Sequence, residues 1–181
     1  MSKTPAFSIK DNIITIPNYP KEGIMFRDVS SLLENPRGLR ETTSIFAQKL
    51  KVIKFDKIAG IEARGFVFGA ALSDRLNKSF IPIRKKGKLP RKRISQDYEL
   101  EYGVDTLEVH ESSVANGDKV VLVDDLIATG GTASASVKLI TSLGGEIVAS
   151  LFVIGLPELG GVDSLESQKI TVITLCEFDG K

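Results

Sequence analysis

One stretch of the chain limits the possible folds more than any other. Between residues 119 and 143, an apolar run, an acid pair, a small-residue loop and a helical pattern follow one another. The apolar run, Val120 to Val123, is rich in β-branched residues and predicts a strand that is buried on both faces, as in a parallel sheet. Asp124 and Asp125 follow this strand directly, and the helical pattern runs from Ala133 to about Leu143. A strand, a loop and a helix in this order indicate an α/β fold.

The loop between the acid pair and the helix has the composition of a phosphate cradle. It consists of Ala128, Thr129, Gly130, Gly131 and Thr132. Loop N–H groups at a helix start attract anions, because the helix N-terminus carries about +0.5 charge. The glycine patterns of nucleoside-triphosphate and dinucleotide loops are both absent. Carboxylates at a strand end suit ribose hydroxyls, or Mg²⁺ held through them. The predicted ligand is therefore a sugar phosphate.

A second strand, loop and helix precede the first in the chain. Lys57 to Ile61 is a short apolar strand, Glu62 to Phe66 forms a turn, and a helical pattern continues to Leu76. Arg64 stands in this turn, where a helix dipole disfavours a cation. Its rigid fork of donors suits pyrophosphate oxygens, which favours a binding role over a surface role.

Basic residues accumulate between residues 84 and 93. They are Arg84, Lys85, Lys86, Lys88, Arg91, Lys92 and Arg93. The run has three interpretations: a solvated face, a nucleic-acid contact without the usual interleaved aromatics, or electrostatic capture of pyrophosphate. Residues 95–103 then alternate polar and apolar residues and predict an exposed ribbon or lid, with residues 106–110 as its second arm. The candidates for chemistry on this ribbon are Tyr98, Glu99, Glu101 and Tyr102.

Elsewhere the N-terminal segment is hard to interpret, because Pro17 and Pro20 interrupt regular structure. Asn35 and Pro36 predict a helix start, with Asn35 as the N-cap and the helix continuing to about Lys51.

Composition bounds the remaining possibilities. The 181 residues favour one domain, and a hydrophobic content of 42% allows a sizeable core. A net charge of +1 gives no global field for nucleic acid. No apolar run approaches the ~18 residues of a membrane helix, and the N-terminus has no apolar signal core. The single cysteine, Cys176, fits a reducing compartment. We therefore expect a cytoplasmic protein that binds neither nucleic acid nor membrane.

Several motifs resemble one family. Val-Val-Leu-Val-Asp-Asp-Leu-Ile-Ala-Thr-Gly-Gly-Thr resembles the phosphoribosyl-pyrophosphate motif of type I phosphoribosyltransferases, and its ending is similar to that of the adenine-specific members. The segments Glu-Ala-Arg-Gly-Phe-Val-Phe-Gly, Arg-Lys-Lys-Gly-Lys-Leu-Pro and Tyr-Glu-Leu-Glu-Tyr-Gly resemble that group's pyrophosphate loop, basic loop and catalytic flap. The resemblance runs from about Ile14 to Leu175. It implies one α/β domain over residues 1–181, with a parallel sheet flanked by helices, a small N-terminal hood (about 1–34) and a flexible β-ribbon flap (about 84–110).

The resemblance also implies roles for individual residues. The 5-phosphate and ribose would bind at Asp124, Asp125, Ala128, Thr129, Gly130, Gly131 and Thr132. Pyrophosphate would bind at Arg64, Lys85, Lys88 and Tyr102, and adenine at Met25, Phe26 and the backbone of Arg27. Glu101 would be the catalytic acid–base, with Arg64 as a second catalytic residue. Glu99 is the alternative acid–base, because it faces the same side of a strand as Glu101. The resemblance further implies a cis peptide between Glu62 and Ala63.

The activity implied is the transfer of a phosphoribosyl group from phosphoribosyl pyrophosphate to adenine, which gives AMP and pyrophosphate in purine salvage. The cofactor implied is Mg²⁺, held mainly through the substrate near Asp124 and Asp125 and without direct metal ligation by the protein. A homodimer is implied as well. Two alternatives stay open: a related transferase for an oxopurine base, and a non-catalytic regulator on the same fold that senses a metabolite or binds RNA or DNA. The basic run between residues 84 and 93 is the best support for the regulator.

Overall fold

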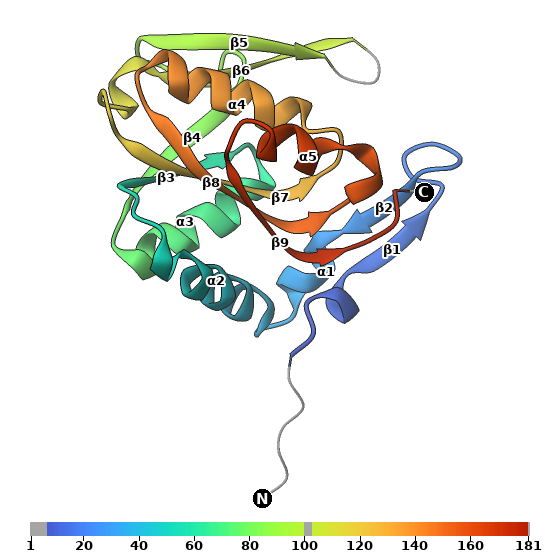
Figure 1. The fold of residues 1–181 in the computed structure, drawn as a ribbon. Helices are drawn as coiled ribbons and strands as arrows, with labels where there is room; N and C mark the ends of the chain where they lie inside the picture. The colour runs from blue at the N-terminus through green and yellow to red at the C-terminus, as the bar shows by residue number, and fades with distance from the viewer. Residues whose placement is uncertain (1–6, 100–102, 181) are drawn as a thin grey trace, which may run out of the picture.

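The computed structural model describes residues 7–99 and 103–180. In this part of the chain the strands form one seven-stranded sheet, in the order β5-β6-β4-β3-β7-β8-β9, and one two-stranded sheet, β1-β2 (Figure 1). The strands are β1 (Ile14–Pro17), β2 (Met25–Asp28), β3 (Lys57–Ile61), β4 (Ser79–Lys85), β5 (Arg93–Glu99), β6 (Val104–His110), β7 (Lys119–Ile127), β8 (Glu146–Gly155) and β9 (Thr171–Glu177). The α-helices are α1 (Val29–Glu34), α2 (Gly38–Lys49), α3 (Arg64–Leu76), α4 (Gly131–Ser142) and α5 (Gly161–Glu166). Short 3₁₀ turns cover Lys10–Asn12, Leu50–Val52, Glu111–Ser113 and Pro157–Leu159.

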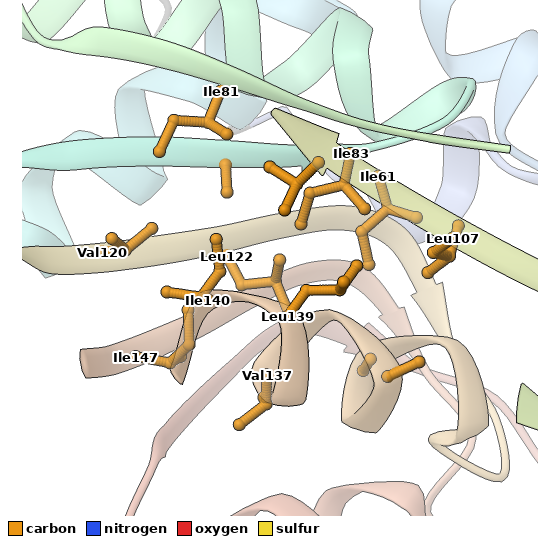
Figure 2. Close-up of a cluster of buried hydrophobic side chains, with 14 of the residues drawn as sticks. Ile61, Ile81, Ile83, Leu107, Val120, Leu122, Val137, Leu139, Ile140 and Ile147 are labelled. Atoms are coloured by element: carbon orange, nitrogen blue, oxygen red, sulfur yellow. The ribbon is translucent and has the colours of Figure 1, made fainter. Parts of the chain in front are cut away.

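The large sheet is parallel from β4 to β9, and at its edge β6 pairs antiparallel with both β4 and β5. Helices cover both faces of the parallel part. Helices α1, α2 and α3 contribute Leu32, Phe46 and Phe68 to one apolar cluster, and α4 and α5 contribute Leu139 and Leu165 to the other. Figure 2 shows how Ile140 and its neighbours on α4 pack against strand side chains in the second cluster. The predicted α/β architecture is confirmed.

Strand β7 is longer than its apolar run. It continues through both aspartates to Ile127, whereas the sequence predicted that the strand would end before Asp124. The reason lies in its two neighbours: pairing with β3 ends at Val123, but pairing with β8 continues to Ile127. From Asp124 onward the strand therefore has one open side, and the turn after β3 lies against it.

The predicted helix start, with Asn35 as the N-cap, is wrong by two residues, because the N-cap of α2 is Arg37. Helix α1 has already ended at Glu34, and α2 begins at Gly38. The Oδ1 atom of Asn35 accepts a hydrogen bond from the Arg37 amide at 2.9 Å, while its own carbonyl accepts from Gly38 at 2.8 Å. Asn35 therefore organises the turn between two helices. The patterns at residues 29–34 were too short to predict α1.

Strands β5 and β6 form an antiparallel ribbon that packs over α4 (Figure 1). The alternating segment predicted this ribbon. At the start of α4, the ribbon backbone comes so close that a Cβ atom on Gly131 would lie 3.3 Å from the carbonyl oxygen of Glu99. The ribbon therefore lies directly over the loop that precedes α4.

Candidate active site

Two strand–turn–helix units place their turns side by side at the carboxyl ends of β3 and β7, because these strands are parallel neighbours. Ligands of open α/β sheets bind at this edge. A polar cavity of about 270 Å³ lies there. It is lined by Glu62, Ala63, Arg64, Lys85, Tyr98, the segment Asp124–Ala133 and Phe152. The two turns singled out in the sequence thus form one cavity.

An ion pair connects the two turns. The Nε atom of Arg64, the first residue of α3, lies 2.9 Å from Oδ2 of Asp125 on β7. The Asp125 side chain is 5% exposed and the Arg64 side chain 48% exposed, so a buried carboxylate holds a guanidinium that still faces the cavity. Gly65 permits this approach, because a Cβ there would lie 2.6 Å from the Val123 carbonyl oxygen. The expected cis peptide between Glu62 and Ala63 is present in this turn.

Asp124 lies at the floor of the cavity, beside the buried Asp125. Burial, and then repulsion by Asp125, raise the pKa of Asp124 well above its usual value. Its Oδ1 atom accepts a hydrogen bond from the Asp125 amide at 2.9 Å. Positive charge or hydroxyl donors brought in by a ligand would stabilise the ionised form. This side chain therefore fits a ribose or a cation bound through one.

The segment Ala128–Thr132 leads into α4 as the sequence predicted, although the helix begins at Gly131 and not at Ala133. No described side chain caps this helix start, so its first N–H groups remain available to a ligand, and its first residues line the cavity. The segment is held from behind by Gly161 of α5, whose amide donates to the Ala128 carbonyl at 3.0 Å. A Cβ on Gly161 would lie 2.3 Å from that carbonyl oxygen. The conformation of the cradle thus depends on the close approach of the Gly161 backbone to the Ala128 carbonyl.

The basic run between residues 84 and 93 is paired with carboxylates. Glu62 lies 3.3 Å from Nε of Arg84 and 2.7 Å from Nζ of Lys88, and it accepts the Lys85 amide at 2.8 Å. Burial raises the pKa of Glu62, but the hydrogen bonds from Lys88, the Lys85 amide and Arg84 outweigh burial and lower it to about 2. Further along the run, Nε of Arg93 lies 3.1 Å from the buried Glu108. These carboxylates shape the loop and reduce its net field.

Lys85 reaches the polar cavity in a small network of its own. Its Nζ atom donates to Oη of Tyr98 at 2.7 Å and forms an ion pair with Asp105 of β6. The Tyr98 hydroxyl also donates to Asp105, at 3.2 Å. Burial lowers the pKa of Lys85, but the bonds to Asp105 and Tyr98 reverse this effect and raise it. The hydrogen bond from Lys85 lowers the pKa of Asp105.

A second cavity, of about 670 Å³, adjoins the first at the cradle. Both are lined by Ala128, Thr129, Gly131 and Thr132. The second cavity is more apolar, and its other lining residues are Gly23, Ile24, Met25, Glu99, Leu156, Leu159 and Gly180. A polar and an apolar compartment thus meet at one phosphate-type loop.

Most of the residues predicted from the sequence lie around these two cavities. Arg64, Lys85, the two aspartates and the cradle line the first, and Met25 lines the second. Lys88 pairs with Glu62 and lines neither cavity. Phe26 packs edge-on against Tyr19, with a centroid separation of 5.1 Å. The predicted acid–base Glu101 and the predicted pyrophosphate contact Tyr102 lie outside the described residues.

Sequence reasoning missed three contributors to the site. Glu62 and Asp105 hold the basic loop, and Gly180 closes the apolar cavity. The position of Glu62, two residues before Arg64 in the same turn, was a signal for its role. No local pattern pointed to Asp105 or Gly180, because their partners are distant in the sequence.

Residues 7–99 and 103–180 contain no helix that is long and apolar enough to cross a bilayer. They also contain no group of three or more His, Cys, Asp or Glu side chains that could hold a metal ion.

A parallel sheet with an acid pair running into an uncapped phosphate cradle, and an arginine turn facing it, defines a class of phosphoribosyl-binding proteins. The family model of the phosphoribosyl transferase domain matches residues 28–175. The chain therefore belongs to the phosphoribosyltransferase family, and the relatives below place it among the adenine phosphoribosyltransferases.

These relatives match nearly the whole chain. An adenine phosphoribosyltransferase from Shewanella loihica is 54% identical over 173 residues, which cover 96% of this chain and 96% of that protein. The crystal structure of adenine phosphoribosyltransferase from Thermoanaerobacter pseudethanolicus has a TM-score of 0.89 at 46% identity, and the match covers 94% of this chain and 98% of that one. The enzyme from Saccharomyces cerevisiae, solved with adenine and an imino-altritol bisphosphate, has a TM-score of 0.87 at 37% identity, over 93% and 96% of the two chains.

Proposed function

We propose that this protein is a purine-salvage enzyme that transfers the phosphoribosyl group of phosphoribosyl pyrophosphate to adenine, giving AMP and pyrophosphate. The observation that carries the proposal is the meeting of the polar and apolar cavities at Ala128–Thr132. A phosphate on this loop places the sugar between the two compartments, with its pyrophosphate on the polar side and the base on the apolar side. The relatives named above support adenine as that base.

In the proposed complex, the N–H groups at the start of α4 bind the 5-phosphate, and the acid pair faces the ribose hydroxyls. Arg64, held by Asp125, binds the pyrophosphate together with Lys85, and Lys88 joins them when it leaves Glu62. Met25 packs against the base, with Phe26 and the backbone of Arg27 nearby. Tyr102 completes the pyrophosphate contacts.

Breaking the anomeric C–O bond builds positive charge on the sugar and negative charge on the pyrophosphate. The guanidinium and ammonium groups stabilise that negative charge in a water-poor cavity, where electrostatic interactions are strong. Glu101 acts as the general acid–base toward adenine, which contributes about 10²–10⁴-fold to the rate. The ribbon covers the cradle and excludes water that would hydrolyse the sugar donor.

We propose Mg²⁺ as the cofactor. The two carboxylates Asp124 and Asp125 suit a cation that takes oxygen ligands, and the raised pKa of Asp124 indicates a carboxyl short of positive charge. Because Asp125 already pairs with Arg64, substrate oxygens would supply most of the ligands. When bound, Mg²⁺ neutralises charge on the departing pyrophosphate.

We further propose that the enzyme is a cytoplasmic homodimer of one-domain subunits, each with residues 1–34 as a hood and residues 84–110 as a flap. Exposed apolar side chains on the hood, Ile14 at 59% and Tyr19 at 53% exposed, offer a surface for a second copy. Light scattering on the purified protein tests the dimer.

The first experiment is pyrophosphate release from phosphoribosyl pyrophosphate and Mg²⁺, with adenine, hypoxanthine, guanine or no base. We expect turnover with adenine alone. Glu101→Gln should reduce kcat at least about 100-fold, whereas Glu99→Gln, on the described arm of the ribbon, should keep most of the activity. A larger loss of activity in Glu99→Gln than in Glu101→Gln would make Glu99 the acid–base.

Other outcomes would replace the proposal. Turnover with an oxopurine would make the protein a transferase for that base. Tight binding of the sugar donor without turnover would favour a regulator. The ion pairs of Arg84, Lys88 and Arg93 with carboxylates weigh against a regulator that uses the basic run to bind nucleic acid.

A further inference from the structure

Arg27 is a buried cation that has no carboxylate partner among the residues that the structure describes. The residue is 9% exposed, and none of the ion pairs in the described part of the chain includes it. Its Nη1 atom donates to Oγ1 of Thr15 at 2.7 Å, and its Nε atom is buried without a hydrogen-bond partner there. Burying an arginine in this way is costly unless the contacts it makes serve another purpose.

The remaining contacts of Arg27 are with the C-terminal tail, residues 178–180. Its Nη2 atom donates to the Asp179 carbonyl at 3.0 Å, and its guanidinium carbon lies 4.6 Å from the centre of the Phe178 ring. The tail thus packs beside the β1-β2 sheet, although about 150 residues separate them in the sequence; Figure 1 shows the C-terminal end next to these strands. One side chain thus connects the β1-β2 sheet to residues 178–180.

The tail also contacts the opposite wall of the apolar cavity. The Gly180 amide donates to Oε2 of Glu158 at 3.2 Å, and Gly180 packs against Leu159. Gly180 and Leu159 both line the cavity, and so does Met25, which lies two residues before Arg27 on β2. The tail therefore connects the wall formed by β2 to the wall formed by residues 156–160.

We infer that the Arg27 side chain and residues 178–180 form a clasp that sets the distance between the two walls of the base pocket, so that Arg27 is a positioning residue for adenine. The inference deepens the proposed function and rests on it. The guanidinium acts through the tail and need not touch the base. Its fork geometry matters, because it must reach Thr15, Asp179 and the Phe178 ring at once.

Steady-state kinetics of Arg27→Met test the clasp. Methionine keeps the length and apolar character of the side chain and removes every donor. We expect KM for adenine to rise about tenfold and KM for phosphoribosyl pyrophosphate to change less than about twofold. The reason is that the substitution frees the walls of the apolar cavity and leaves the polar cavity unchanged. Arg27→Lys keeps the charge over Phe178 and should recover part of the loss. Arg37→Met is the matched control, since Arg37 also lies over a phenylalanine ring, that of Phe7 at 5.0 Å, but lines neither cavity.

A double-mutant cycle separates the clasp from general destabilisation. If Arg27 acts through the tail, adding Phe178→Leu to Arg27→Met should raise KM for adenine by less than about twofold beyond the single variant. Additive losses would overturn the clasp, as would an unchanged KM for adenine in Arg27→Met or an equal rise in both KM values.

Hydrogen exchange provides a readout that needs no turnover. The Phe178 amide donates to the Gly155 carbonyl at 3.1 Å and the Gly180 amide to Glu158, so both should be protected in the parent protein. In Arg27→Met, both amides should exchange at least about fivefold faster, while amides of β7 keep their rates. Faster exchange in a protein without adenine turnover would retain the clasp and reject the proposed function. Unchanged exchange would reject the clasp even in an active enzyme.

Discussion

The guanidinium of Arg64 and the carboxylate of Asp125 lie 2.9 Å apart, and they come from turns that are about 60 residues apart in the chain. Parallel pairing of β3 with β7 brings the two turns together, and the end of that pairing at Val123 leaves room for the arginine. The pair thus fixes the direction of the donor fork before any ligand binds.

This geometry predicts that Arg64→Lys is not a conservative change. Lysine keeps the charge but cannot bond Asp125 and pyrophosphate with a planar fork, so kcat/KM for phosphoribosyl pyrophosphate should fall about 100-fold, or about 2.7 kcal/mol. Steady-state kinetics measure the effect. Arg75→Lys, near the other end of α3, should leave the kinetics unchanged. A loss below about threefold at Arg64 would show that only its charge matters.

Glu62 predicts how stability depends on pH. Its pKa is lowered from 4.5 to about 2 in the folded protein, so its contribution is full above pH 4.5 and is lost as the pH falls through 2. Glu62→Gln should lower the free energy of unfolding by roughly 2 kcal/mol at pH 7, and the difference should shrink between pH 4.5 and 2. Urea unfolding at several pH values measures this. Glu41→Gln, which breaks the exposed pair with Arg37, should cost less than about 1 kcal/mol.

Asp105 forms an ion pair with Lys85, the side chain that we propose binds pyrophosphate. If Lys85 must leave this carboxylate to bind pyrophosphate, Asp105→Asn should tighten pyrophosphate binding about threefold and lower the pKa of Lys85. Product-inhibition kinetics and NMR titration of the lysine Nζ groups measure the two effects. Asp97→Asn is the control on the same ribbon, because Asp97 bonds Thr106 at its exposed side. Weaker binding in Asp105→Asn would mean that the carboxylate holds Lys85 in place for the ligand.

The cradle should be sensitive to one methyl group behind it. In Gly161→Ala, the new Cβ would lie 2.3 Å from the Ala128 carbonyl oxygen and 2.7 Å from the Gly130 amide nitrogen, so the cradle backbone must move. We expect KM for phosphoribosyl pyrophosphate to rise at least about tenfold and stability to fall by about 1–3 kcal/mol. Kinetics and thermal unfolding measure these changes. Asp163→Ala, two residues further along α5 and exposed, should change neither; an unchanged KM in Gly161→Ala would show that the cradle adapts.

The sequence predicted the features that depend on local patterns. Val120–Val123 indicated a buried strand, and Ala128–Thr132 indicated an anion-binding loop, because apolar periodicity and glycine content are local properties. Asp124 and its neighbours lie at the carboxyl edge of the sheet, as the sequence predicted, but strand β7 continues past them. The length of a strand depends on how far its pairing with each neighbouring strand extends, and this cannot be deduced from the strand alone.

Features that depend on contacts between residues distant in the sequence could not be predicted from local patterns. The partners of the basic run, Glu62 and Glu108, lie before and after it in the chain, and no spacing rule connects them. The same holds for the tail, where Phe178 and Asp179 meet Arg27 only in the folded protein. Helix α1 was missed for another reason: six residues hold too little periodicity to indicate a helix.

The contact between Arg27 and Asp179 has a consequence for the order in which the molecule is made. On the ribosome the β1-β2 hairpin emerges before the large sheet, and residues 178–180 emerge after it. Strands β4, β6, β7 and β8 can each pair as synthesis continues, because each of them has a neighbour that is already made. The base pocket that we propose cannot form so early, because Arg27 needs the Asp179 carbonyl, which is synthesised about 150 residues later. A nascent chain can therefore form the proposed phosphate loop before the proposed base pocket, which is completed only once residues 178–180 have been made.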